Sequence, residues 1–372
     1  MLEKPNLADH AILSQVQEEY GLHITRIDFL PIGFDVDTAV YRLETADGTA
    51  YFLKLRKGPF YETCVTLPQF LKMQGLRSII PPLETQSHRL WGNLEDYKLI
   101  LYPFIQGQDG YQVALTDRQW LDFGVSLHSI HTAQLPPALR QLIPQETFSP
   151  HWRDTVMQFQ SQIETEAFSE PVAAKLAGFM RQRQGTITQA VRRASQLASA
   201  LQARHLEFVL THSDIHPGNL HLTPQGELYI VDWDNPMFAP KERDLNLIGG
   251  SGIGHWRTSR EEALFYQGYF PTHPDLSSDP DHRGDLYRSG GFDRSGGFDR
   301  GYQTPILPPP GIDRMALAYY RYERIVVDMA EFCNQLFLTT DGGEDREQSY
   351  LYFTGTFLPD HDIEIAIRND LP

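Results

Sequence analysis

Three side chains that could take part in a reaction, Asp214, Asn219 and Asp232, stand at the ends of two short apolar runs, NLHL and ELYIVDW. Residues 223–226, TPQG, separate the runs and favour a β-hairpin that would bring the three side chains together. One carboxylate could then accept the proton of a hydroxyl group, while the other carboxylate and the amide oxygen are ligands that Mg²⁺ prefers. Phosphoryl transfer needs this combination, because its transition state is stabilised mainly by position and charge.

The spacing of these residues matches the catalytic loop of protein kinases. Asp214 and Asn219 are five residues apart, as in H-R-D-x-x-x-x-N, and His212 stands at the position of the pattern's histidine. Asp232 closes the run YIVD, where the aspartate of D-F-G would stand. A polar loop that only caps a hairpin is the alternative, but it does not account for these residue types at these offsets. We therefore expect Asp214 to accept a proton, and Asn219 and Asp232 to bind Mg²⁺.

The segments HSDIHPGN and IVDWDNP resemble the aminoglycoside phosphotransferase family of antibiotic kinases and its small-molecule relatives, such as choline kinases. Within that family, IVDWDNPMFAPKERDLNLIGG and YRYERIVVDMAEF look most like the spectinomycin phosphotransferases. The resemblance implies an α+β, bilobal, protein-kinase-like fold, with a small β-rich N-terminal lobe and a larger, mostly helical C-terminal lobe. It also implies a structural role for Asp244, which would hold the catalytic loop together with His212.

Composition and charge narrow the class of protein. A chain of 372 residues with 41% hydrophobic content can form two lobes with a core. The formal net charge of −16 argues against nucleic acid or an anionic membrane as partner and suits a cationic substrate. No apolar run is long enough to span a membrane and the N-terminus lacks a secretory signature, so we expect a cytoplasmic protein. The expected oligomeric state is a monomer or a homodimer. Cys64 and Cys333 lack metal-type spacing and are expected to be buried thiols.

The small lobe should begin with a helix and three strands, at 7–20, 24–30, 38–45 and 50–56. Lys54 lies between two leucines in the third strand, so alternation points it to the opposite face. A kinase places there the lysine that holds the α- and β-phosphates, although a solvent-facing strand lysine is the alternative. The loop at 31–37 occupies the position of the phosphate-covering loop, with Gly33 as its only glycine.

The resemblance also supplies the remaining nucleotide contacts. Glu62 is the nearest candidate for the helix glutamate that pairs with Lys54, and the main chain from Tyr102 to Phe104 would bind the base. ATP and Mg²⁺ are the expected cofactors, with GTP left open as an alternative nucleotide.

The chain is expected to divide at a hinge near residues 102–107. Residues 1–106 would form the nucleotide-binding lobe, and residues 107–372 the catalytic and substrate-binding lobe. The second lobe would carry a flexible insertion at about 274–312, where SGGFDR occurs twice in succession.

The expected acceptor is a small cationic polyol, so acidic and aromatic residues are the candidates for contacting it. They are Asp234, Trp233, Trp256, Glu323 and Asp328. For Asp234, two residues after Asp232, contact with the metal or with the lysine, or a loop-capping role, remains an alternative. For the acidic helix residues the alternative is a solvated face paired with Arg321 and Arg324. The expected activity is ATP-dependent transfer of a phosphoryl group to an alcohol, with a spectinomycin-like aminocyclitol as first choice. A metabolite kinase for choline, an amino alcohol or a sugar, and a nucleotide-binding pseudokinase, remain alternatives.

Overall fold

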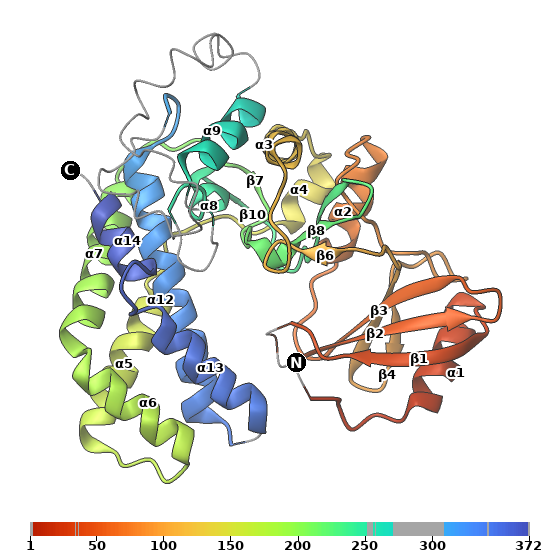
Figure 1. Ribbon diagram of the computed structural model, residues 1–372, viewed down its shortest axis with the longest axis horizontal. Coiled ribbons are helices and arrows are strands. Elements are labelled where there is room, and N and C mark those ends of the chain that lie inside the picture. The colour runs from red at the N-terminus through yellow and green to blue at the C-terminus, as the bar shows by residue number, and fades with distance from the viewer. Residues whose placement is uncertain are drawn as a thin grey trace, which may run out of the picture.

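The computed structural model describes residues 3–33, 35, 37–250, 256, 258–270, 309–340 and 342–370. Within these residues the chain forms a β-rich N-terminal lobe and a larger, mostly helical C-terminal lobe (Figure 1). The α+β, two-lobed arrangement expected from the sequence is therefore confirmed. The expected insertion at 274–312 lies outside the described residues as far as residue 308.

The N-terminal lobe is an antiparallel five-stranded sheet in the order β1-β2-β3-β5-β4. Its elements are α1 (Asp9–Tyr20), β1 (Ile24–Leu30), β2 (Thr38–Thr45), β3 (Ala50–Arg56), α2 (Thr63–Met73), β4 (Gly92–Leu94) and β5 (Tyr97–Pro103). The first three strands have the bounds predicted from alternation. Helix α1 begins two residues later than predicted, at Asp9, and ends as predicted at Tyr20, followed by Gly21 in a left-handed conformation.

Strand β3 has two faces with different neighbours. Leu53 and Leu55 are fully buried in the core that the sheet shares with α1. Lys54 lies between them and therefore points to the other face, where it is only 8% exposed. The strand thus carries a buried cation on the face away from the core of its own lobe.

The C-terminal lobe is built mainly from helices and has two apolar cores. Its helices are α3 (Asp117–His131), α4 (Pro137–Leu142), α5 (His151–Thr165), α6 (Pro171–Gln182), α7 (Gln184–Gln202), α8 (Glu242–Leu245), α9 (Ser259–Tyr269), α12 (Arg314–Leu338), α13 (Gly343–Gly355) and α14 (Asp362–Asn369). One core lies where α12 packs against α5, α7 and α14, and the other contains α3, α9 and the short strands. Helix α12 contributes most of its buried residues to the first core and Leu317 to the second.

Helices α3 and α9 approach each other closely because each contributes a glycine at the crossing. A Cβ atom on Gly124 of α3 would lie only 2.1 Å from the carbonyl oxygen of Phe265. A Cβ atom on Gly268 of α9 would lie equally close to the carbonyl oxygen of Leu121. The absence of side chains at both positions allows the two backbones to touch.

Five short strands position the segment that contains Asp214, Asn219 and Asp232. They are β6 (Gln108–Asp109), β7 (Val209–Thr211), β8 (Leu220–Leu222), β9 (Leu228–Ile230) and β10 (Met237–Ala239). Strands β8 and β9 form the predicted hairpin, in which Leu220 pairs with Ile230, and Gly226 completes its turn with a φ of 91°. Strands β7 and β10 pair in a second ladder, which brings the start and the end of the segment side by side.

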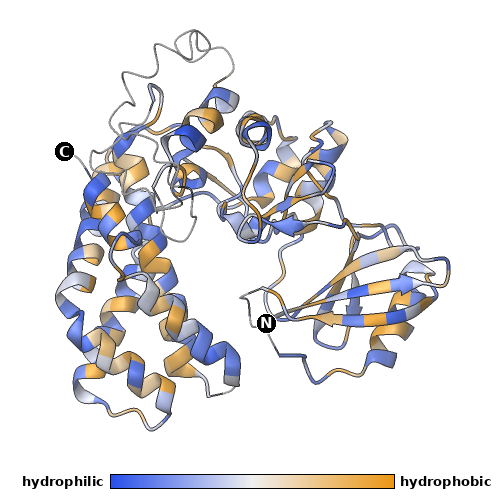
Figure 2. Ribbon diagram, viewed as in Figure 1, coloured by the Kyte–Doolittle hydropathy of each residue, from blue (hydrophilic) through white to orange (hydrophobic). Residues whose placement is uncertain are grey.

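Figure 2 shows apolar and hydrophilic residues alternating along the strands of the N-terminal sheet and forming stripes on the helices of the other lobe. In the part of the chain that the structure describes, no helix has both the length and the apolar character needed to cross a bilayer.

Candidate active site

The loop that follows β7 is held in place by a buried carboxylate. Asp244 of α8 is fully buried and accepts hydrogen bonds from the backbone N–H groups of His212, at 2.8 Å, and Ser213, at 2.7 Å. The Nε2 atom of His131 lies 3.1 Å from the same carboxylate, and the other ring nitrogen lies 2.6 Å from the hydroxyl of Tyr269. Ser213 has a φ of 74°, so these bonds stabilise a backbone conformation that is rare outside glycine.

His212 connects this loop to the end of the hairpin. Its Nε2 lies 3.0 Å from the carbonyl oxygen of Val231, and its Nδ1 accepts a hydrogen bond from the backbone N–H of Asp214 at 3.3 Å. Both contacts are satisfied by the neutral tautomer with its proton on Nε2. The ring thus fixes the backbone of Asp214 relative to the residue that precedes Asp232.

Asn219 links Asp214 to the same region. Its amide nitrogen donates to the backbone oxygen of Asp214 at 2.8 Å and lies 3.4 Å from the Oδ2 atom. The backbone oxygen of Asn219 accepts a hydrogen bond from the N–H of Val231 at 3.0 Å. Because the amide nitrogen faces Asp214, the Oδ1 atom of Asn219 lies on the other side of the planar group.

The carboxylate of Asp214 lies between two basic side chains. The Nη1 atom of Arg324, on α12, forms an ion pair with its Oδ1, and the Nε2 of His216 lies 3.7 Å from its Oδ2. Burial raises the pKa of Asp214, but Arg324 and His216 together outweigh burial and hold that pKa well below its usual range. Asp214 is therefore ionised at neutral pH.

Lys54 joins the two lobes through a cluster of charges. Its Nζ lies 2.6 Å from Oδ1 of Asp232 and 2.9 Å from Oδ2 of Asp234, and Arg56 also forms an ion pair with Asp234. Burial lowers the pKa of Lys54, but the two carboxylates outweigh burial and raise it, so the amine stays charged. For Asp232 the two effects are reversed: burial raises its pKa, but Lys54 lowers that pKa by more than burial raises it. Asp232 has a φ of 66°, a conformation that aspartate tolerates better than most residues.

These contacts correct the expected pairing of Lys54 with Glu62. Glu62 is exposed at the N-cap of α2, and within the described residues it makes no ion pair with Lys54. The carboxylates that pair with the lysine are Asp232 and Asp234. Of the contacts expected for Asp234, the structure therefore shows the one with the lysine, and it adds an ion pair with Arg56.

The proposed base-binding and phosphate-loop residues lie in the N-terminal lobe. Tyr102 lies in β5 opposite Phe52, and the backbone N–H of Phe104 donates to the carbonyl oxygen of Ala50 at 3.2 Å. Gly33 has a φ of 88°, which favours glycine. Residues 34 and 36 of the same loop lie outside the described part of the chain.

Three of the residues expected to contact the acceptor belong to the cores instead. Trp233 and Trp256 are each 4% exposed. The first donates its indole N–H to the carbonyl oxygen of Ile230, and the second packs in an aromatic cluster with Trp120 and Phe123. Composition alone could not separate these buried rings from rings that line a cleft.

Glu323 is also buried, 3.1 Å from Arg153 of α5. Burial raises its pKa to about 7, against the opposing effect of the nearby guanidinium. Its ion pair connects α12 to α5 inside the first core, which corrects its expected place among the substrate contacts.

Asp328 does lie beside the catalytic loop. It is four residues after Arg324 on α12, and its Oδ1 lies 3.0 Å from the Nε of that arginine. Burial raises the pKa of Asp328 more than Arg324 lowers it. Asp214, Arg324 and Asp328 thus form one continuous set of charges.

Sequence reasoning missed three basic residues of this site: Arg56, His216 and Arg324. Two of them carried a signal. Arg56 follows Lys54 by two residues, which places it on the same face of β3, and His216 lies inside the loop between Asp214 and Asn219. For Arg324 the sequence offers only the alternative of a solvated ion pair, because its contact with Asp214 joins positions 110 residues apart in the sequence.

The chain is similar to several known proteins. The chain aligns with spectinomycin phosphotransferase, APH(9)-Ia, crystallised in complex with ADP and spectinomycin, with a TM-score of 0.81 and 30% identity over 99% of each chain. An amicoumacin kinase crystallised with AMP-PNP and Ca²⁺ has the same fold, with a TM-score of 0.57 and 14% identity over 95% of each chain. Protein StrN of Streptomyces griseus is 25% identical over 262 residues, which cover 66% of this chain and 77% of StrN.

The sequence pattern of the phosphotransferase enzyme family, APH, matches residues 28–278. This range contains Lys54 and the whole segment from Asp214 to Asp232. The resemblance inferred from the motifs is therefore confirmed, and the chain belongs to the phosphotransferase enzyme family as a phosphotransferase with the kinase-like fold.

Proposed function

We propose that the protein transfers the γ-phosphoryl group of ATP to a hydroxyl of a small cationic polyol, with spectinomycin-like aminocyclitols as the first candidates. The observation that carries this proposal is the convergence of Asp214, Asn219 and Asp232 next to Lys54. A proton acceptor, two oxygen donors and a buried cation then meet where the two lobes face each other. The 30% identity to spectinomycin phosphotransferase over the whole chain supports the choice of acceptor.

The residues on the nucleotide side fit a metal–triphosphate group. Lys54 and Arg56 provide two positive charges on one face of β3. Asp232 uses one carboxylate oxygen for Lys54, and Asn219 turns its amide oxygen away from Asp214. Mg²⁺ takes few protein ligands and keeps phosphate oxygens and waters in its shell, so one carboxylate and one amide are sufficient. When bound, the metal–nucleotide would supply the phosphoryl group and neutralise its charge.

Asp214 would act on the acceptor. As the acceptor oxygen bonds to the γ-phosphorus and the bond to the oxygen of ADP breaks, the hydroxyl proton passes to a carboxylate oxygen of Asp214. The low pKa of Asp214 keeps it ionised and ready to accept that hydrogen bond. A weak base is sufficient because the attacking oxygen carries little charge in a loose transition state.

The charges around Asp214 favour the binding of a cationic acceptor. Asp328 and Glu331 lie on α12 close to Asp214, and Arg324 provides the positive charge that opposes them. An ammonium group next to the reacting hydroxyl would be attracted to this acidic wall. Amino alcohols share this chemistry with aminocyclitols, so they belong in the same test.

ADP release with a panel of acceptors tests the proposal. The panel contains spectinomycin, choline, ethanolamine, aminopropanol and glucose, with myo-inositol as the neutral polyol. We expect ADP release with spectinomycin and a product that carries one additional phosphate by mass spectrometry. Asp214→Asn should reduce both signals by roughly 10²- to 10⁴-fold. Binding of ATP without ADP release for every acceptor would contradict the proposal, and turnover of choline alone would identify a metabolite kinase.

A further inference from the structure

Arg324 covers the Oδ1 atom of Asp214, one of the two oxygens that an acceptor hydroxyl could approach. Its Nη1 forms an ion pair with the Oδ1 of Asp214, while its Nε lies 3.0 Å from Asp328. The other oxygen of Asp214 faces the amide of Asn219, at 3.4 Å, and the ring of His216, at 3.7 Å. Both oxygens of the carboxylate therefore have a positive or hydrogen-bonding neighbour before any acceptor arrives.

The contact between Arg324 and Asp214 is only partly shielded from solvent. The side chain of Arg324 is 27% exposed and that of Asp214 is 33% exposed, whereas Asp328 is 13% exposed. An incoming ligand would therefore meet an ion pair that solvent already reaches in part. Asp328 lies deeper and anchors the guanidinium from behind.

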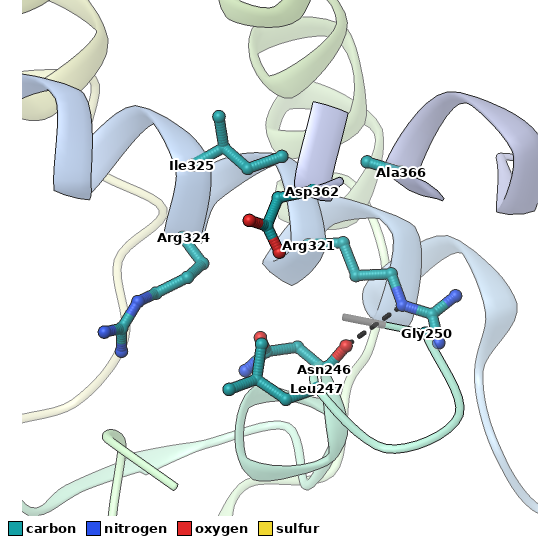
Figure 3. A pocket seen from close by; sticks show the side chains of 8 residues that line it. All are labelled: Asn246, Leu247, Gly250, Arg321, Arg324, Ile325, Asp362 and Ala366. Carbon is teal, nitrogen blue, oxygen red and sulfur yellow. Dashed lines mark hydrogen bonds between the residues drawn. The ribbon is translucent and has the colours of Figure 1, made fainter. Parts of the chain in front are cut away.

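A second carboxylate lies within the pocket that Arg324 helps to line. Figure 3 shows this pocket between α12, α14 and the segment around Asn246, with Asp362 at its centre and Arg324 pointing away from it. Arg321 points to the other side and donates to the backbone oxygen of Asn246 at 3.0 Å. Asp362 also acts electrostatically on Asp328, so it adds to the negative charge around α12 at this position.

We propose that Arg324 determines acceptor selectivity, because only an acceptor that brings its own ammonium group can replace the guanidinium beside Asp214. This inference rests on the proposed phosphotransferase function. A neutral polyol would break the ion pair and offer Asp214 and Asp328 no cation in return, which is unfavourable in a partly desolvated site. An ammonium group of the acceptor would restore the charge balance, so the resident arginine rejects the neutral compound.

The same contact restrains transfer to water. In that side reaction a water oxygen would bond to the γ-phosphorus, the bond to the oxygen of ADP would break, and one water proton would pass to Asp214, giving ADP and inorganic phosphate. Water brings no cation, so it would have to act while Arg324 holds the carboxylate. ATP hydrolysis without acceptor should therefore be slow in the wild-type enzyme.

The test compares Arg324→Gln and Arg324→Lys with the wild type. ADP release is measured without acceptor, with myo-inositol and with the best cationic acceptor of the panel. In R324Q we expect acceptor-independent ADP release to rise about tenfold, and the ratio of kcat/KM for myo-inositol to that for the cationic acceptor to rise about tenfold. R324K should change both quantities in the same direction but less, because one ammonium cannot hold both carboxylates as a guanidinium does.

The matched control is Arg118→Gln. Arg118 pairs with Asp122 at the same four-residue spacing, but on the exposed surface of α3. R118Q should leave both quantities unchanged. A melting curve shows whether R324Q is folded, and if it is not, R324K decides.

Two results would overturn the inference. One is unchanged acceptor-independent ADP release in folded R324Q. The other is a parallel loss of turnover with cationic and neutral acceptors, which would make Arg324 a contact of the transferring phosphoryl group. The wild-type panel decides the proposed function separately: a wild type that phosphorylates a cationic acceptor, combined with unchanged ratios in the variants, would refute the selectivity role alone.

Discussion

The Nζ of Lys54 lies 2.6 Å from Oδ1 of Asp232, a residue 178 positions further along the chain, and this contact connects the N-terminal sheet to the catalytic hairpin. Replacement of Lys54 by methionine keeps much of the side-chain volume and removes the cation. We expect the Kd for ATP to rise roughly 10- to 100-fold, because a charge-assisted contact to phosphate is lost. Calorimetric titration with ATP measures the change. Lys98→Met on the neighbouring strand β5 is the control, and equal weakening in both variants would count against a specific role for Lys54.

Asp214→Asn keeps the shape of the side chain and removes its ability to accept a proton. We expect kcat to fall by roughly 10²- to 10⁴-fold, while the Kd for ATP changes by no more than about threefold. Steady-state ADP release and nucleotide titration on the same preparation give the two numbers. A loss of ATP affinity as large as the loss of turnover would assign Asp214 to nucleotide binding instead.

The parts of this molecule that sequence reasoning placed well depend on local order. Strands β1 to β3 follow from side-chain alternation, and the hairpin of β8 and β9 follows from the TPQG turn between two apolar runs. Asp214, Asn219 and Asp232 flank this hairpin, so their proximity could be predicted from local order. The exact placement of the loop that carries Asp214 could not be predicted, because it depends on Asp244 of α8.

Residues paired across the fold were harder to place. Glu62 and Asp234 are both acidic and both follow apolar strands, and only the packing of the two lobes decides that Asp234 reaches Lys54. Trp233 and Trp256 are chemically suited to bind a cation, yet they fill the second core. Arg324 is brought to Asp214 by helix α12, whose position depends on contacts with α5, α7 and α14.

Glu331 should make acceptor binding depend on pH. It lies on α12 in the electrostatic range of Asp328, Arg324, Asp214 and Asp35. Part of its side chain is open to solvent. Burial of its carboxyl group, followed by the negative charge of Asp328, raises the pKa of Glu331 to about 7, and Arg324 opposes this rise. The group is neutral below that pH and negative above it, so binding of a cation should strengthen as the pH rises through 7.

The measurement is the KM of choline, or of the best permanently charged acceptor, between pH 6 and pH 8. We expect KM to fall about two- to fivefold over this range, as for one partly exposed ion pair. Glu331→Gln should remove this pH dependence and keep the higher KM throughout. If the variant follows the wild-type curve, another group causes the effect.

The crossing of α3 and α9 should tolerate no side chain larger than hydrogen. In Gly124→Ala the new methyl group would meet the carbonyl oxygen of Phe265, which belongs to a backbone that cannot move freely. We expect a loss of about 2–3 kcal/mol in the free energy of unfolding, as for other overpacked positions. Gly178→Ala in the middle of α6 is the control. No atom lies within 4 Å of its added methyl group, so it should be neutral or stabilising by up to about 1 kcal/mol. Equal unfolding curves for the two variants would show that the helices can separate.

Asp244 should be the most sensitive support of the catalytic loop. Its carboxylate accepts hydrogen bonds from two successive backbone N–H groups, those of His212 and Ser213, and neither bond can be replaced by water at a fully buried position. Asp244→Asn retains one carbonyl oxygen, but its N–H₂ group would face either the N–H of Ser213, or the N–H of His212 together with the ring of His131. We expect a loss of about 3 kcal/mol in the free energy of unfolding, because a buried donor stays unsatisfied. Denaturant unfolding measures this loss of stability, with Asp122→Asn on the exposed face of α3 as control.

Turnover of the Asp244→Asn variant should fall as well, even at temperatures where the variant is fully folded, because Ser213 keeps its positive φ only while these bonds hold. Full activity in a destabilised D244N would mean that His212 alone is sufficient to position Asp214.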